Sequence, residues 1–208
     1  MRILPPASCR DIGPRATLWG NLASASLEEV TTFQDETLRR SRYHDLIVMG
    51  RVAELTAGQL HNMVMQSGKP VIVAPSKPTR QIGERVLISW KDGPEAAKAV
   101  AAAMPILAHA KQVTIVTVPE HSAGDAADRV SAESLAKQLR WHGINANVQV
   151  SDSPVISTSK KLEEIAFALD ADLLVMGAYG HSRMREFMFG GVTRDLLSAC
   201  AIPILMMH

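Results

Sequence analysis

The chain has 208 residues, and 47% of them are hydrophobic, which allows a sizeable core in one large domain or in one and a half small ones. Its formal net charge is +1 and only 4% of its residues are aromatic, which argues against binding nucleic acid through bulk phosphate attraction or base stacking. The two cysteines, Cys9 and Cys200, form no disulfide framework, and no apolar run is long enough to span a bilayer, so we expect a soluble, cytoplasmic protein that binds neither nucleic acid nor membranes.

The first predicted elements lie in residues 1–76. The sequence predicts a helix over 26–40, an apolar strand over 45–50 and a second apolar strand over 69–75. A polar, proline-rich stretch follows these elements, and we place a linker at 77–82 within it.

A regular alternation of strands and helices begins at residue 83. The predicted strands are 85–90, 112–118, 145–151, 172–177 and 203–207. The predicted helices are 91–104, 125–143, 159–170 and 191–200. Because these strands alternate with helices and are apolar throughout, residues 83–208 predict an α/β fold, a doubly wound parallel five-stranded sheet of Rossmann-like type with helices on both faces.

The two parts of the chain resemble each other. Residues 45–50, DLIVMG, match residues 172–177, DLLVMG, at five of six positions, and the strand over 69–75 corresponds to residues 202–207. The first part lacks a clear equivalent of the opening strand–helix–strand. We therefore expect a partial first copy at 1–76 and a complete second copy at 83–208.

Glycines follow the strand over 172–177 and precede the next helix. Gly177 and Gly180 let the backbone turn and come close to a ligand, at the sheet edge where doubly wound folds bind ligands. Gly190 and Gly191 stand at the start of the helix, where free N–H groups favour an anion. The pattern fits a phosphate-binding loop, and it fits equally well glycines that only form turns.

The spacing Gly177-x2-Gly180-x9-Gly190 resembles the nucleotide-binding signature of the universal stress protein family. The segments GAYGHSR, FGGVTR and IPILMMH resemble bacterial members that carry two such domains in tandem, and residues 1–76 resemble the second half of a first domain. The resemblance implies a stress-linked protein with dimer-like packing, of which some relatives bind ATP. It also implies that the strands over 69–75 and 203–207 pair antiparallel within the chain.

The same resemblance implies a site for ATP or ADP, with or without Mg²⁺. The residues carried over to it come from strand ends, the glycine loop and the start of the last helix: Ser89, Trp90, Lys91, Asp92, Val118, Met176, Gly177, Gly180, His181, Ser182, Arg183, Gly190, Gly191, Val192 and Thr193.

Three of these residues depart from the family pattern or have two readings. Gly191 stands where the pattern has Ser or Thr, and the lost hydroxyl weakens phosphate binding by roughly 1.5–3 kcal/mol. Lys91 stands where ATP-binding relatives carry Asp, and it either pairs with a phosphate or is solvated. Trp90 either packs on the adenine or fills the adenine pocket.

The loop residues after Gly180 are candidate ligand contacts rather than catalysts. His181 and Ser182 are adjacent in sequence, a spacing that seldom gives nucleophile–base geometry, and Arg183 either reaches a phosphate or lies on the surface. The histidines show no metal-ligand spacing, so we predict no metal site and no catalytic residue. In the first copy Ala53 replaces the equivalent of Gly180, so we predict no nucleotide site there.

Three hypotheses follow from the sequence, of which an adenylate-forming or hydrolytic enzyme lacks support, because no acid–base pair or metal cluster appears near the glycine loop; the other two are non-enzymatic. The first is a non-enzymatic stress protein in which ATP or ADP shifts conformation or partner binding, as a homodimer or with another protein. The second is an interaction module of the same fold that has lost its ligand.

Overall fold

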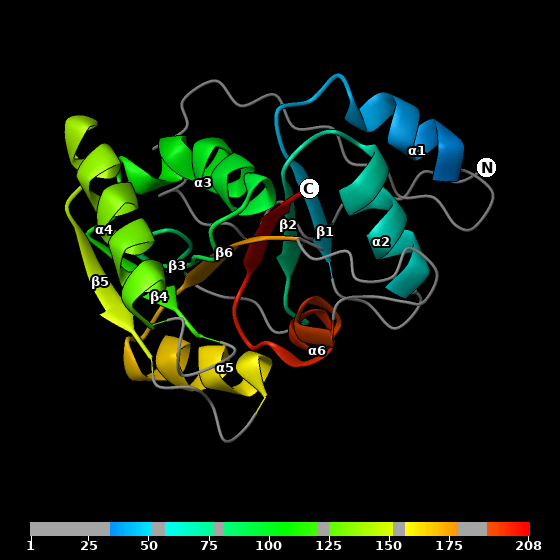
Figure 1. The fold of residues 1–208 in the computed structure, drawn as a ribbon. Coiled ribbons are helices and arrows are strands. Elements are labelled where there is room, and N and C mark those ends of the chain that lie inside the picture. Colours follow the sequence, from blue (N-terminus) through cyan, green and yellow to red (C-terminus); the bar gives the residue numbers. More distant parts are fainter. Residues whose placement is uncertain (1–33, 51–56, 77–80, 120–124, 152–156, 179–190) are drawn as a thin grey trace.

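This computed structural model describes residues 34–50, 57–76, 81–119, 125–151, 157–178 and 191–208 (Figure 1). The strands are β1 (Ile47–Gly50), β2 (Val71–Ala74), β3 (Arg85–Ser89), β4 (Gln112–Thr117), β5 (Ala146–Val150), β6 (Leu173–Gly177) and β7 (Ile204–Met207). The helices are α1 (Gln34–Ser41), α2 (Ala57–Gln66), α3 (Pro94–Leu107), α4 (Asp125–Trp141), α5 (Thr158–Ala168) and α6 (Gly191–Ala199).

All the described strands form one mixed sheet in the order β1-β2-β7-β6-β3-β4-β5. The parallel part from β7 to β5 confirms the five-stranded sheet predicted for residues 83–208. The sheet continues past β7, because β2 pairs with it antiparallel and β1 pairs parallel with β2. The antiparallel pairing of the two terminal strands, which the family resemblance predicted, is therefore confirmed.

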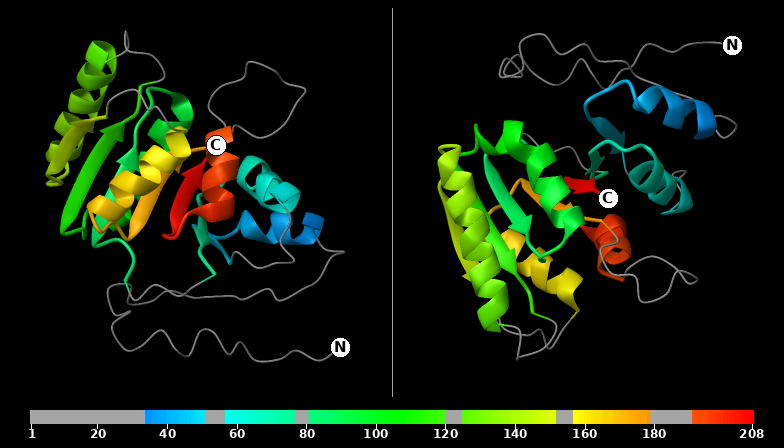
Figure 2. Two further views of the ribbon diagram at one scale, coloured as in Figure 1. Left: turned by 90° about the horizontal axis from the view of Figure 1, so that it is seen from below. Right: turned by 45° about the horizontal axis from the view of Figure 1, so that its top comes forward.

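Helices cover both faces of this sheet (Figure 2). On one face, α3 and α4 pack on a core that includes Val86, Ile88 and Val175. On the other face, α1, α2, α5 and α6 pack on a core that includes Leu87, Leu174 and Met206. Successive strand residues thus point into opposite cores, as a doubly covered parallel sheet requires.

Several element boundaries differ from the expected ones. The sequence patterns gave no helix between the first two strands, whereas α2 occupies residues 57–66 there. The helix expected to end at residue 104 continues through Pro105 to Leu107, because the fully buried Leu107 anchors its last turn. Of the helix expected over 26–40, α1 accounts for the part after Gln34, and residues 26–33 lie outside the described ranges.

The boundary between the two copies stays a prediction, since the sheet runs across it. Residues 77–80 of the expected linker lie outside the described ranges. Within the described ranges, no helix is both long enough and apolar enough to cross a bilayer.

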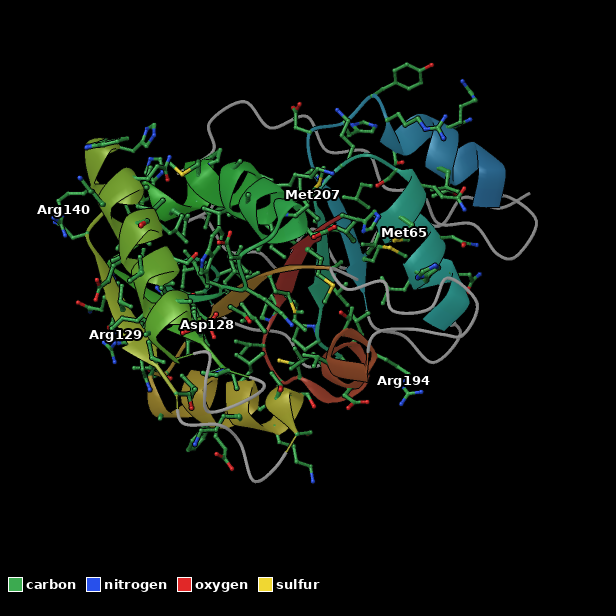
Figure 3. All side chains as sticks on the ribbon, viewed as in Figure 1. Met65, Asp128, Arg129, Arg140, Arg194 and Met207 are labelled. Atoms are coloured by element: carbon green, nitrogen blue, oxygen red, sulfur yellow. The ribbon has the colours of Figure 1, made fainter. Side chains whose placement is uncertain are left out.

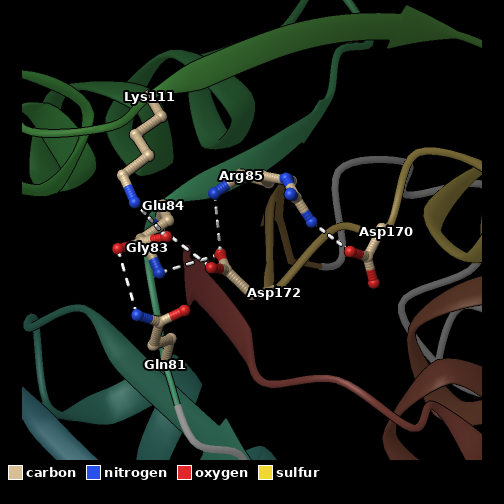
Figure 4. Close-up of polar contacts among 7 residues, drawn as sticks. All are labelled: Gln81, Gly83, Glu84, Arg85, Lys111, Asp170 and Asp172. Carbon is tan, nitrogen blue, oxygen red and sulfur yellow. Dashed lines mark hydrogen bonds and ion pairs between the residues drawn. The ribbon is translucent and has the colours of Figure 1, made fainter.

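A single carboxylate joins the start of β3 to the start of β6 (Figure 4). Asp172 accepts hydrogen bonds from the backbone N–H groups of Gly83 at 2.9 Å, Glu84 at 3.0 Å and Arg85 at 3.1 Å. The Asp172 N–H donates back to the Arg85 carbonyl at 2.9 Å. Around this clamp lie two exposed ion pairs, Glu84 with Lys111 and Arg85 with Asp170. The clamp fixes the register of the central strands, in which Val86 is the partner of Leu173.

We expect Asp172→Asn to destabilise the protein by about 1–3 kcal/mol, because an amide lacks the charge and one of the two acceptor oxygens that hold three N–H groups. Urea unfolding followed by circular dichroism measures the change. Asp170→Asn is the matched control, because this carboxylate is exposed and its ion pair with Arg85 lies on the surface. Equal stability of Asp172→Asn and the unmodified chain would contradict the clamp.

Candidate functional site

The connections after β3 and β6 leave the sheet on opposite faces. These strands are neighbours, yet α3 follows β3 on one face and α6 follows β6 on the other. In doubly wound folds, such a change of face marks the sheet edge, beyond the carboxyl ends of the two strands, at which ligands bind. Ser89 and Met176, which are register partners, reach this edge together.

The structure brings most of the described candidate residues to this end of the sheet. Ser89 ends β3, and Trp90, Lys91 and Asp92 follow it directly. Met176 and Gly177 end β6, and Val118 comes one residue after β4. Gly191, Val192 and Thr193 form the first turn of α6. Gly180, His181, Ser182, Arg183 and Gly190 lie outside the described residues, so their role stays a prediction.

The Trp90 side chain points to the α3 and α4 side of the sheet. It is 9% exposed and belongs to the core under these helices. Its indole Nε1 donates a hydrogen bond to Ser131 Oγ on α4 at 2.9 Å, and its backbone N–H donates to the Val116 carbonyl at 2.8 Å. The indole is therefore fixed by α4, on the face opposite to α6.

An open groove of about 760 Å³ lies beside this tryptophan. Its lining consists of residues that follow β3 and one side of α4: Trp90, Asp92, Ala126, Ala127, Val130, Ser131, Ser134, Leu135 and Gln138. Most of this lining is apolar, with hydroxyl, amide and carboxylate groups among it. The sequence patterns did not place α4 at the site, because the hydrogen bond to Ser131 joins residues far apart in the chain.

Gly177 is explained by packing within the protein. A Cβ at this position would lie 2.5 Å from the backbone nitrogen of Ala96 and 2.7 Å from the carbonyl carbon of Glu95. Both atoms belong to the first turn of α3. A glycine is thus needed where β6 ends against this helix, whether or not a ligand binds nearby.

The first turn of α6 presents a different glycine. Gly191 is exposed, and a Cβ there would meet no atom of the described residues within 4 Å. Val192 packs on the core and Thr193 is only 4% exposed, so the turn is anchored on its inner side. Arg194 extends from the outer side of the same helix (Figure 3) and lies 3.7 Å from Asp195. Space for a ligand group or a larger side chain therefore exists at Gly191.

Two histidines lie next to this edge, and the sequence patterns had assigned them no role. His208 follows β7, and its Nδ1 lies 3.1 Å from the carbonyl oxygen of Ala178, the residue after β6. Burial lowers the pKa of His61 on α2, and the nearby His208 lowers it further. Their position follows from the pairing of β6 with β7, in which Gly177 is the partner of Met207. Among the described residues, no group of His, Cys, Asp or Glu is arranged to hold a metal ion.

We expect Gly177→Ala to destabilise the protein by about 1–3 kcal/mol, because the added methyl group overlaps the backbone of α3. Thermal unfolding of both proteins gives the comparison. Gly191→Ala adds the same methyl group in open space and serves as the control. A Gly177→Ala protein as stable as the control would show that β6 and α3 do not meet closely.

The lowered pKa of His61 makes stability depend on pH. Its folded-state pKa lies below the ordinary value of 6.5, so the unfolded chain binds the proton first as the pH falls. Stability should therefore decline as the pH falls from about 6.5 toward the lowered pKa. Urea unfolding at pH 7.5 and pH 5.5 should show a smaller decline for His61→Gln than for the unmodified chain. A substitution at the exposed His142 should leave the decline unchanged, and an equal decline in all three proteins would contradict the assignment.

Comparison with known proteins places this architecture in a family. The profile of the Universal stress protein family matches residues 84–208, which is more than half of the chain. A universal stress protein from Archaeoglobus fulgidus DSM 4304 superposes with a TM-score of 0.67 at 17% identity, over 84% of this chain and 66% of that one. A functionally unknown protein from Pseudomonas aeruginosa PAO1 superposes with a TM-score of 0.60 at 13% identity, over 86% of this chain and 68% of that one.

These two structures support the fold, and the chain spans about two thirds of their length. A universal stress protein solved in complex with cAMP also matches, with a TM-score of 0.47 at 21% identity, over 60% of this chain and 97% of that one. A search of curated proteins gives no match. From the profile match over residues 84–208, the chain belongs to the universal stress protein family.

Proposed function

We propose that the chain binds an adenine nucleotide, ATP or ADP, at the carboxyl ends of β3 and β6, and that the nucleotide controls partner binding rather than being turned over. The observation that carries the proposal is the change of face at these neighbouring strands: α3 and the groove beside Trp90 follow β3 on one face, and the start of α6 follows β6 on the other. This edge offers an apolar lining for a base and free helical N–H groups for phosphates.

The described residues fit such a ligand in two respects. The groove of about 760 Å³ has mostly apolar walls, with the Asp92 carboxylate and the Ser131 hydroxyl among them. At the start of α6, no described atom lies within 4 Å of a Cβ at Gly191, which leaves room for phosphate oxygens to approach the backbone. Mg²⁺, where the nucleotide brings it, would neutralise phosphate charge. The same proposal includes a cytoplasmic location and a homodimeric state for the protein.

Two observations favour the second candidate function, an interaction module without a nucleotide. The close contact with α3 is enough to explain why position 177 is glycine, without any ligand. Trp90 is already hydrogen-bonded to Ser131. Both features would persist in a protein that had lost its ligand. A binding experiment therefore has to separate the two candidates.

Isothermal titration with Mg-ATP is that experiment. We expect one site per chain, and we expect Gly180→Val, which adds a branched side chain to the predicted phosphate loop, to abolish the heat of binding. No heat at millimolar ATP with a folded protein would reject nucleotide binding in favour of the interaction module.

A gain of affinity gives a sharper test of the same site. Gly191→Ser places a hydroxyl group in open space at the start of α6 and should tighten ATP binding by roughly tenfold, as one hydrogen bond to a charged group does. Gly191→Ala is the matched control, because it adds the same Cβ and raises helix propensity without a hydroxyl. Equal affinities of the serine and alanine variants would show that the phosphates do not lie at this turn.

A further inference from the structure

Strand β1 repeats β6 in structure as well as in sequence. The N–H group of Ile47 donates to the Pro70 carbonyl at 3.0 Å, and the N–H group of Leu174 donates to the Pro203 carbonyl at the same distance. Val48 is the register partner of Ile72, and Val175 is the partner of Leu205. Since Ile72 and Leu205 pair antiparallel, the two halves are related by a pseudo-twofold axis between β2 and β7.

The edge of β6 that faces away from β7 contacts β3 and α3. Its leading carboxylate, Asp172, accepts three backbone N–H groups from the start of β3. Leu173 and Val175 are both 0% exposed in the core under α3. Gly177 lets the first turn of α3 approach its backbone. Four positions of DLLVMG thus form the contact surface for a strand and the helix that follows it.

Strand β1 carries the same four residue types with nothing described on that side. Val48 is 65% exposed and Leu46 is 39% exposed, although their counterparts in β6 are fully buried. Asp45 is exposed, and within the described ranges its carboxylate accepts no hydrogen bond and forms no ion pair. Among the described strands, only β2 lies beside β1.

The edge of β1 that faces away from β2, called its free edge because no described strand covers it, also lacks the features that usually protect such edges. Its residues, Ile47–Gly50, include no charged side chain and no proline. Because the Ile47 N–H group points to β2, alternation along the strand turns the N–H groups of Val48 and Gly50 to the open side. An incoming strand would find free backbone groups, an apolar surface and a carboxylate in the arrangement that β3 finds on β6.

We propose that the free edge of β1 binds a strand–helix segment of a partner protein, with the strand parallel to β1 and the helix over Leu46 and Val48. The first N–H groups of this strand bind Asp45, and small residues of its helix pack toward Gly50. The chemistry of this partner follows from β3 and α3, whose buried helix face is built from Ala96, Ala99 and Ala103. A second copy cannot donate its own β3 without opening its sheet, because β3 lies between β4 and β6.

The probe is a fluorescein-labelled peptide of residues 83–108, which carries the sequence of β3 and α3. We expect saturable binding to the full chain by fluorescence anisotropy. Asp45→Asn should weaken binding about tenfold, because the strand then loses a charged hydrogen-bond acceptor. Val48→Asp should weaken binding at least as much, because it places a charge under the incoming helix. The assay contains no nucleotide, so its outcome does not depend on the proposed function.

Two substitutions elsewhere are the matched controls. Asp170→Asn removes another exposed carboxylate, and Phe167→Asp adds a charge at an apolar side chain that is 90% exposed on α5. Both should bind the peptide as the unmodified chain does. Circular dichroism checks that all variants are folded, which we expect because each altered side chain is exposed.

Several outcomes would overturn the proposal. Absence of binding up to the solubility limit of the peptide, or equal binding by Val48→Asp and the controls, would remove the site. A dimer by light scattering that Val48→Asp dissociates would show that a second copy occupies the edge. Protection of the Val48 and Gly50 amides from hydrogen exchange in the isolated monomer would show that the chain covers its own edge.

Discussion

The antiparallel pairing of β2 with β7 is the constraint on which the rest of the structure depends. It joins Val71 to Met206, Ile72 to Leu205 and Val73 to Ile204, and all these side chains are buried. Without this pairing, β7 would be an edge strand with free backbone groups, and β1 and β2 would form only a separate two-stranded sheet. The pairing buries six apolar side chains and satisfies backbone hydrogen bonds at the same time, so β1 and β2 form one sheet with the five strands after residue 83.

This pairing also determines the surroundings of the candidate site. Because β7 is an interior strand, its end is held in register with the end of β6, where Gly177 is the partner of Met207. The C-terminal His208 therefore reaches the Ala178 carbonyl at the carboxyl edge of the sheet. The N-terminal part of the chain supplies His61, whose pKa is lowered by its burial and by the nearby His208. His61 therefore lies close to His208, although it is distant in sequence from residues 84–208.

The sequence was enough to predict most of the fold because strands buried on both faces are apolar throughout. This is why the five strands after residue 83 and the alternation with helices were predicted. Helix α2 was missed because its sequence, AGQLHNMVMQ, is short and buries only Leu60, Met63 and Val64. Its stability comes from packing on the sheet, which a local pattern does not reveal.

For the candidate site too, some features could be predicted from local sequence patterns and others could not. Its position could be predicted, since the carboxyl ends of parallel strands meet at one edge and Ser89, Val118 and Met176 end or follow strands. The direction of a side chain could not, because it depends on partners distant in sequence. Trp90 is held by Ser131 of α4, and Gly177 is required by the backbone of α3. The glycine loop at 179–190 lies outside the described residues, and its phosphate role stays a prediction.

The repeated hexapeptide shows the limit of sequence reasoning most directly. DLIVMG and DLLVMG differ by one methyl position, yet Val175 is fully buried and Val48 is largely exposed. Nothing in either segment determines this difference, which depends on whether a strand and a helix lie beside it. The carboxylates that precede the two strands, Asp172 and Asp45, also differ in their surroundings. Asp172 is stabilised by three N–H groups, whereas Asp45 remains hydrated until a polypeptide with free N–H groups replaces the water. Burial of the apolar side chains of Val48 and Leu46 in the same binding step would favour this replacement of water by the partner, because apolar surface is removed from contact with water.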